Sequence, residues 1–227
     1  PSREVTSMRK LLYLSTAATA AMSLSLASPA TAQHPQQAAP VDVLRADLQP
    51  VPHDPLADRG SEVTGKAVLV VEGNEARTIL VARGLSPDLP HAAHIHGDVQ
   101  ARNECPSLAA DDNGDGLIDT VEGLPDYGPI DVSLTTSGGT SGAFSDALAL
   151  DRFPTASRGG TVHYNRVVEL PADVADALDR LHIVVHGADL NGNGAYDFDA
   201  GTSSLSGLVG APVPLEAELP VACGTIG

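Results

Sequence analysis

Short β-prone runs alternate with turn residues along most of the chain beyond residue 61. The runs are rich in Val, Leu, Ile and Ala, and Gly, Pro, Asn and Asp fill the gaps between them. Many short strands separated by such turn signals are typical of a β-sandwich or β-barrel. We therefore predict one all-β domain over residues 61–227. The predicted strands are residues 66–71, 76–82, 92–97, 130–135, 142–148, 161–170, 181–186 and 213–221.

Only one segment, residues 171–180, follows a helical pattern. Pro171 suits the first turn of a helix, where the N–H that it lacks would have no partner. Val174 and Leu178 lie four residues apart on one face, and Arg180 follows near the carboxyl end. One short helix is therefore expected among the strands.

The first 32 residues have the layout of a signal peptide. Met8 is followed by the basic pair Arg9-Lys10, an apolar run over residues 11–27 and the small-residue site Ala30-Thr31-Ala32. Residues 1–7 precede Met8 and are interpreted as an over-called start. Ser and Thr interrupt the apolar run and no charged flank follows it, which disfavours a retained membrane anchor. We expect a secreted protein, located in the extracellular, periplasmic or cell-wall space.

An exported chain would begin at residue 33. Residues 33–60 are rich in Pro, Ala, Gln and Asp, and we predict that they form a flexible linker. The two cysteines, Cys105 and Cys223, both lie in the exported part, where an oxidising compartment favours a single disulfide over two unpaired thiols. Closing so long a loop would stabilise the fold by about 4–5 kcal/mol in the chain-entropy model.

Acidic residues outnumber basic ones by more than two to one. The chain has 29 Asp and Glu against 13 Lys and Arg, for a net charge of −16. Cleavage after Ala32 would remove three basic groups and one acidic group and leave a net charge of −18. Such a surface argues against nucleic acid or an anionic membrane as a partner, and it suits calcium.

Histidines are the first candidates for chemistry. His94 and His96 lie two apart on a predicted strand, so both imidazoles face the same side and can reach one ion. Neutral imidazole is a good ligand for copper and zinc. The alternative is that His94 and His96 are ordinary surface residues. His186, on the predicted strand 181–186, favours a metal site because it supplies a third candidate ligand. His91 and His182 are interpreted as structural.

Four landmarks in this sequence resemble the copper/zinc superoxide dismutase family. Residues 85–97 are similar to the strand that carries the family's His-x-His copper pair, and Val184-Val185-His186 to the strand of a further copper histidine. Cys105, nine residues after His96, and the closing Cys223 segment match the family's disulfide. The resemblance covers about residues 62–227. It implies an eight-stranded Greek-key β-barrel, copper held by His94, His96 and His186, and conversion of superoxide to oxygen and hydrogen peroxide.

The sequence departs from this family in two places. No histidine lies between Gly97 and Val162, so the bridging histidine and the zinc site are missing and zinc is not expected. Pro220 stands where the family has an arginine that guides the anion, which predicts poor electrostatic steering of superoxide. Arg166 is a candidate replacement for that cation. His163 is a candidate fourth copper ligand, with an ordinary strand histidine as the alternative.

A second resemblance leads to a different function. The His-x-His-Gly strand and the later His186-Gly-Ala-Asp189 loop are also similar to bacterial CHRD domains. This likeness implies a non-enzymatic, metal-binding or structural extracellular module. Three functions therefore stay open: a copper-only superoxide dismutase, a protein that binds copper without turnover, and a structural module.

Two acidic loops follow the calcium-loop pattern, in which oxygen ligands alternate around a glycine turn. The first loop runs from residue 111 to residue 122, and its flanking prolines, Pro106 and Pro125, argue against the helix pair of an EF-hand. The second starts in the same way but has no Glu at position 12, and a polar turn is its alternative. The expected calcium ligands are Asp111, Asn113, Asp115, Leu117, Asp119 and Glu122 in the first loop and Asp189, Asn191, Asn193, Ala195 and Asp197 in the second.

Overall fold

The computed structural model of the protein describes residues 40–54, 62–98 and 100–227. The predicted signal peptide and residues 33–39 of the predicted linker lie outside these ranges. Eight strands dominate the described part, which confirms the all-β prediction. They are β1 (Val41–Pro50), β2 (Thr64–Glu72), β3 (Glu75–Arg83), β4 (Ala93–His96), β5 (Ile130–Ser133), β6 (Thr161–Glu169), β7 (His182–His186) and β8 (Pro220–Thr225).

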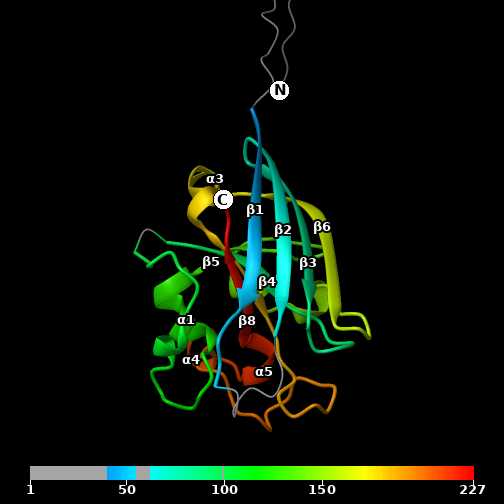
Figure 1. The fold of residues 1–227 in the computed structure, drawn as a ribbon, viewed down its shortest axis with the longest axis vertical. Coiled ribbons are helices and arrows are strands. Elements are labelled where there is room, and N and C mark those ends of the chain that lie inside the picture. Colours follow the sequence, from blue (N-terminus) through cyan, green and yellow to red (C-terminus); the bar gives the residue numbers. More distant parts are fainter. Residues whose placement is uncertain (1–39, 55–61, 99) are drawn as a thin grey trace, which may run out of the picture. The chain divides into compact units, whose positions relative to one another are not determined.

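The strands form one curled antiparallel sheet (Figure 1) in the order β5-β4-β7-β8-β1-β2-β3-β6. Strands β3 and β6, and β4 and β7, are neighbours without being consecutive, as in Greek-key connections. The sheet ends at β5 and β6, so the curl is a half-barrel whose backbone ladder stays open in the described residues. Arg166 of β6 reaches across this opening and donates hydrogen bonds to Thr135, just after β5, and to the Gly138 carbonyl.

Side chains that alternate along the strands fill the inside of the curl. In β3, for example, Ala76, Thr78, Leu80 and Ala82 are buried, whereas most of the residues between them are exposed. Leu, Val, Ile and Ala make up almost all of the main core. Because the chain has few aromatic residues, such small aliphatic side chains must supply most of the buried apolar area.

The predicted linker over residues 33–60 is wrong for β1. This strand pairs with β2 along most of its length and with β8 at its end. Ala46 and Leu48 are buried in the core, so the fold begins near residue 41 and not at residue 61. A Pro- and Asp-containing composition suggested a linker, but the period-two apolar pattern decides the structure because both neighbouring strands bury it.

Two predicted strands and the count of one helix also need correction. Residues 142–148 contain a helical turn and no strand, and residues 213–221 divide between another helical turn and the start of β8. The helix predicted over residues 171–180 is confirmed as α3 followed by a 3-10 turn. The helices are α1 (Thr120–Tyr127), α2 (Phe144–Ala147), α3 (Ala172–Ala177), α4 (Ser206–Val209) and α5 (Leu215–Glu218), and the 3-10 turns are η1 (Leu108–Ala110), η2 (Leu150–Arg152) and η3 (Leu178–Arg180).

The predicted disulfide is present between Cys105 and Cys223. Their Cα atoms are 5.7 Å apart, and the bridge ties the long segment after β4 to β8. Cys223 packs in a second cluster with Val184, Ile118 and Tyr127, on the side of β7 and β8 that faces away from the main core. The bridge therefore holds the covering segment with α1 against the outside of the sheet.

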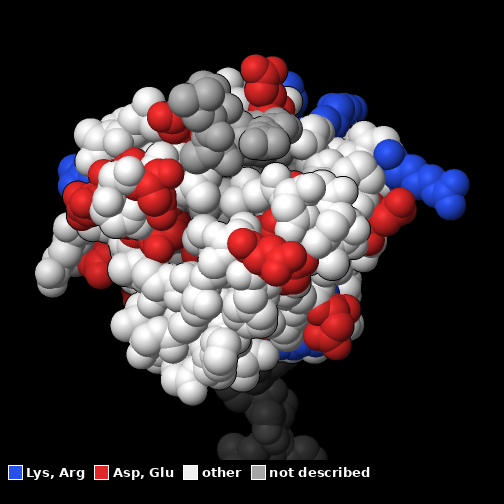
Figure 2. All heavy atoms as spheres, turned by 90° about the horizontal axis from the view of Figure 1, so that it is seen from below, with Lys and Arg blue, Asp and Glu red and all other residues white. Residues whose placement is uncertain are grey.

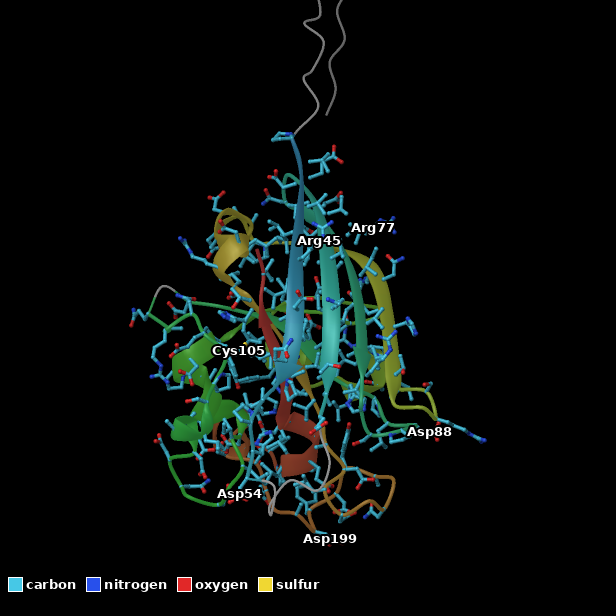
Figure 3. All side chains as sticks on the ribbon, in the orientation of Figure 1. Arg45, Asp54, Arg77, Asp88, Cys105 and Asp199 are labelled. Atoms are coloured by element: carbon cyan, nitrogen blue, oxygen red, sulfur yellow. A yellow bond between two sulfur atoms is a disulfide. The ribbon has the colours of Figure 1, made fainter. Side chains whose placement is uncertain are left out.

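No helix in the described part of the chain is long and apolar enough to cross a membrane. Charge is unevenly distributed on one end of the molecule. Asp and Glu gather on the end of the molecule that holds α5 and the acidic loops, while Lys and Arg lie toward the edges of that view (Figure 2). Asp54 and Asp199 lie at this end, and Arg45 and Arg77 lie toward the opposite end of the strands (Figure 3).

Candidate metal centre

Three buried histidines meet on the outer face of two neighbouring strands. His94 and His96 come from β4, and His186 is the last residue of β7, which pairs with β4. Ile95 and Val185 point to the main core, so the alternation of the strands turns the histidines to the opposite side. Their ring centroids lie 5.0–5.7 Å apart. We call His94, His96 and His186 the histidine trio.

Each ring of the histidine trio uses one nitrogen for a hydrogen bond to a backbone carbonyl. A carbonyl oxygen only accepts, so the bonded nitrogen carries the proton and the other nitrogen keeps its lone pair. This bond also fixes the orientation of the ring. The bonds run from His94 Nε2 to Ala147 at 3.1 Å, from His96 Nδ1 to Gly128 at 2.9 Å and from His186 Nδ1 to Glu218 at 2.7 Å.

The remaining three nitrogens have no hydrogen-bond partner. They are His94 Nδ1, His96 Nε2 and His186 Nε2, and all three are buried. One ligand nitrogen from each ring lies within 4.8 Å of the others. Ligands at about 2.0–2.1 Å from one ion would lie at most about 4 Å apart, so a shift of under about 1 Å completes the site. Three neighbouring buried rings, each with one nitrogen that has no hydrogen-bond partner, fit a metal ion.

Burial keeps these rings neutral. It lowers the pKa of His94 well below its ordinary value, and it lowers the pKa of His96 to about 3 and of His186 to about 4. Charge repulsion within the histidine trio lowers the pKa of His94 and His96 further. Neutral imidazole is the form that binds a metal, so protons do not compete for the site near neutral pH.

Aromatic side chains pack against two of the rings. Tyr127 lies 4.6 Å from His96 between ring centroids, and Phe153 lies 5.4 Å from His94, both edge-to-face. Tyr127 is itself held by a hydrogen bond from its hydroxyl to the Thr120 carbonyl. These contacts restrict the rotation of the two rings on β4.

A polar network holds His186. The Glu218 carbonyl accepts from His186 Nδ1 and from the Thr120 hydroxyl, at 2.7 Å in each case. The Glu218 carboxylate accepts from the Thr120 N–H at 2.9 Å through Oε2, while its buried Oε1 has no hydrogen-bond partner. Burial, reinforced by Asp119, raises the pKa of Glu218 to about 7. The first turn of α1 is thus connected through α5 to the third histidine.

A cavity of about 200 Å³ lies against His94 and His186. Its wall is mostly apolar, and none of the described residues that line it is Lys or Arg. Arg166, the candidate replacement for a guiding cation, is bound to Thr135 and Gly138 and does not line this cavity. The environment next to the histidine trio is therefore apolar and has no guiding cation.

The structure does not bring His163, the candidate fourth ligand, into the histidine trio, which agrees with the alternative of an ordinary strand histidine. His163 lies opposite Val81 in the ladder of β3 and β6, is exposed, and does not belong to the convergent group. His91 and His182 are structural, as predicted. His91 bonds the backbone carbonyls of Ser86 and His186, and His182 bonds Thr225.

His53 has a structural role that sequence reasoning missed. It lies in the predicted linker, but its ring is buried, accepts from the Ile118 N–H and donates to the Pro220 carbonyl. The ring therefore joins the end of β1 to the first acidic loop and to β8. The one sequence signal for this role is that His53 follows the alternating apolar residues of β1. Because the composition of residues 33–60 predicted a linker, that signal was not used.

The first acidic loop is well ordered by its own side chains. Asp111 accepts from the N–H groups of Gly114 and Gly116, and Glu122 accepts from those of Asp112, Asn113 and Asp119. Asp119 caps α1, in which Pro125 is accommodated at the sixth position. A helix therefore follows the loop in spite of Pro125, while only the turn η1 precedes it, so no helix pair forms. Asp115 and Leu117 complete the predicted ligand positions on the loop.

The second acidic loop takes a glutamate from a distant element. Glu216 of α5 is fully buried and accepts from the N–H groups of Leu190, Asn191 and Asp197. Glu122 makes the same three contacts, at the equivalent positions, in the first loop. Asp189 accepts from the backbone of residues 192–194, and Asn193 bonds Asp197, while Ala195 lies at position 7. No local pattern could reveal Glu216, because it lies 19 residues beyond Asp197.

The acidic side chains do not converge as the histidines do. Within the described residues, the histidine trio is the one group of three or more His, Cys, Asp or Glu whose ligand atoms come together. Calcium binding by the two loops therefore stays a prediction. Their hydrogen bonds explain why both loops are folded.

Comparison with known proteins does not assign this chain to a family. No protein-family model matches it, and no curated protein does. The likeness to the superoxide dismutases and to CHRD domains rests on the residues quoted above.

Proposed function

We propose that this protein is an exported, superoxide dismutase-like copper-binding protein in which His94, His96 and His186 hold the ion. The observation that carries the proposal is a group of three buried histidines that offer one ligand nitrogen each within 4.8 Å of one another, and each of which keeps one ring nitrogen without a hydrogen-bond partner. Their protons are committed to backbone carbonyls, so the free nitrogens are ready to coordinate. Among first-row divalent metals, copper binds nitrogen ligands most strongly.

Superoxide dismutation is the second candidate, favoured by the copper ligand set and the matching disulfide. Bound copper would supply one-electron chemistry, with superoxide converted to oxygen and hydrogen peroxide. The apolar cavity without Lys or Arg, and the net charge of −16, disfavour rapid capture of an anion. We therefore place copper binding first and turnover second.

The proposal includes export of the protein and calcium binding by its two acidic loops. The signal-peptide pattern of residues 1–32 and the disulfide both suit an oxidising compartment outside the cytosol. Outside the cell, acidic loops with weak affinity, roughly 10⁻⁴ to 10⁻³ M, would bind calcium. A structural module of the CHRD type, with calcium loops and no resident copper, is the alternative.

Copper retention tests the proposal directly. The mature protein is loaded with copper, dialysed and assayed for bound metal, beside a His94→Ala/His96→Ala variant and a His163→Ala control. We expect one copper per chain in the wild type and in the control, because His163 is exposed and outside the trio. The double variant is expected to retain none. If the wild type also loses its copper, the structural module is the better description.

Superoxide removal separates the two copper functions. The loaded wild type and the His163→Ala control are compared with the same concentration of free copper ion. Stoichiometric copper with no activity above the free ion would leave a binding protein and exclude the enzyme. Activity well above the free ion, lost in the double variant, would establish dismutation.

A further inference from the structure

The cavity beside the histidine trio has the size of a small ring compound. Its volume is about 200 Å³, and its wall is formed by His94 and His186 together with apolar residues such as Ala147, Leu150 and Ala217. An engineered apolar cavity of about 150 Å³ is large enough to take up benzene. The space therefore suits one six-membered ring with a small substituent.

Charge in this wall selects against anions. None of the described lining residues is Lys or Arg, and the one carboxylate among them is Glu218. An apolar wall cannot replace the water around an ion, and a nearby carboxylate repels a negative one. The occupant that this cavity favours is neutral.

Apart from Thr120 and the two histidines, whose free nitrogens we assign to the ion, Glu218 is the polar residue among the described residues that line the cavity. Its side chain is 4% exposed, and Oε2 is held by the Thr120 N–H. Oε1 is buried and makes no hydrogen bond of good geometry, although the Ser203 hydroxyl lies close enough to the carboxylate to lower its pKa. An unsatisfied buried acceptor is costly, so a ligand hydroxyl that donates to it would be stabilising.

We propose that this cavity binds a small neutral compound of the phenol class, with its ring in the apolar space and its hydroxyl toward Glu218. The inference rests on the proposed function where it names the class of molecule that would reach the bound copper. It deepens that function, because it names what the site accepts in place of an anion.

Calorimetry with three ligands of similar size tests the selection. Phenol, toluene and benzoate are titrated into the purified metal-free chain at pH 8. We expect phenol to bind with one site, toluene about tenfold more weakly for want of the hydrogen bond, and benzoate not at all. Absence of phenol binding, or equal binding of benzoate, would overturn the inference.

Two variants locate the binding site. Leu150→Trp places a large ring at the cavity wall, and Leu108→Trp adds the same ring at a position that is 52% exposed and outside the wall. We expect phenol affinity to fall at least tenfold in the first variant and to be unchanged in the second. Equal affinity in both would place phenol elsewhere.

Amide chemical shifts of the wild type give a test that needs no variant. Phenol should move the signals of Ala147 and Ala217 and leave those of Ile79 and Val167, on the far strands β3 and β6, in place. Shifts confined to the far strands would contradict the inference. Glu218→Gln should reduce the difference in affinity between phenol and toluene, and an unchanged difference would show that the phenol hydroxyl does not contact Glu218.

The titrations distinguish this inference from the proposed function. They are made without metal, so phenol binding stands even if the protein fails to retain copper. Copper retention without phenol binding would leave the copper proposal intact and reject the cavity as a phenol site.

Discussion

Single backbone carbonyls decide what the histidines can do. Ala147, Gly128 and Glu218 each take the proton-bearing nitrogen of one ring. Without them, either nitrogen of each imidazole could carry the proton, and the three lone pairs would not face one another in every molecule. Groups that orient metal ligands in this way typically change metal affinity by 10–100-fold when they are removed.

Thr120 is the residue at which this effect is best measured. Thr120→Val removes the hydroxyl that donates to the Glu218 carbonyl but keeps the shape of the side chain. We expect copper affinity to fall by up to about 10-fold, since the carbonyl that orients His186 stays in place but loses its second donor. Thr120→Ser keeps the hydroxyl and should bind copper as the wild type does. Competition with a chelator measures all three proteins, and equal affinity in Val and Ser variants would contradict the expectation.

Asp131 carries the clearest prediction of pH dependence away from the histidine trio. Burial first, and then repulsion from Asp173 and Asp98, raises the pKa of Asp131 to about 6. Because the pKa is raised in the folded state, the contribution of the protonated Asp131 to stability is fully present below the ordinary pKa near 4. This contribution is lost as the pH rises through 6. Asp176 and Arg180 line the same groove.

Urea denaturation of Asp131→Asn between pH 4 and pH 8 checks this sign. The amide cannot ionise, so we expect the gain in unfolding free energy over the wild type to grow as the pH rises through 6. Near pH 4 the gain should be smallest. Asp42→Asn, at an exposed position of β1, is the matched control. If the gain for Asp131→Asn shrank with rising pH, ionisation of Asp131 would not be what destabilises the folded protein.

At the scale of elements, the single helical turn α5 joins the acidic loops to the metal centre. Glu216 is bonded by the second loop, and Glu218 by Thr120 at the end of the first. The carbonyl of Glu218 orients His186. An element of four residues therefore contacts three parts of the molecule that are distant in sequence.

Calcium binding by the first loop is the prediction that belongs to this scale. Glu122 occupies position 12, where calcium loops have a bidentate carboxylate. We expect millimolar calcium to raise the melting temperature of the wild type, and Glu122→Gln to remove part of that rise together with one bound calcium ion. Glu75→Gln, at an exposed strand end, is the control. Equal calcium binding by both variants and the wild type would reject the loop as a site.

At the scale of the whole molecule, one covalent bond holds the covering segment to the sheet. The disulfide closes a loop with a sequence separation of 118, and Cys223 lies opposite Val184 of β7 in the ladder. Its removal should release the segment that carries α1 and Tyr127 from the histidine trio. The effect on stability comes largely from the unfolded chain, which gains freedom when the loop opens.

The double variant Cys105→Ser/Cys223→Ser measures this contribution. We expect the free energy of unfolding to fall by about 2–5 kcal/mol, the usual cost of losing a native disulfide. Denaturation of the wild type with and without a reducing agent should show the same difference. A loss well below 1 kcal/mol in both experiments would mean that the covering segment is held by packing alone.

The sequence by itself determined the features that follow from local rules. A period of two turns His94 and His96 to one face, short runs between turn residues specify most strands, and the two cysteines of the sequence pair with each other. Residues 171–180 are helical because their apolar spacing and first-turn proline are also local. The composition obscured β1, whose alternating residues become informative only when β2 and β8 bury them.

Only the tertiary structure decided the features that depend on long-range proximity. The carbonyls of Ala147, Gly128 and Glu218 orient the histidines, yet a carbonyl is present in every residue and no residue type marks its position. Glu216 replaces a missing loop glutamate from another element, and His163 falls outside the site because β6 lies at the far edge of the sheet. The physical reason is the same in each case. The packing of distant segments, which local patterns do not encode, sets which groups meet.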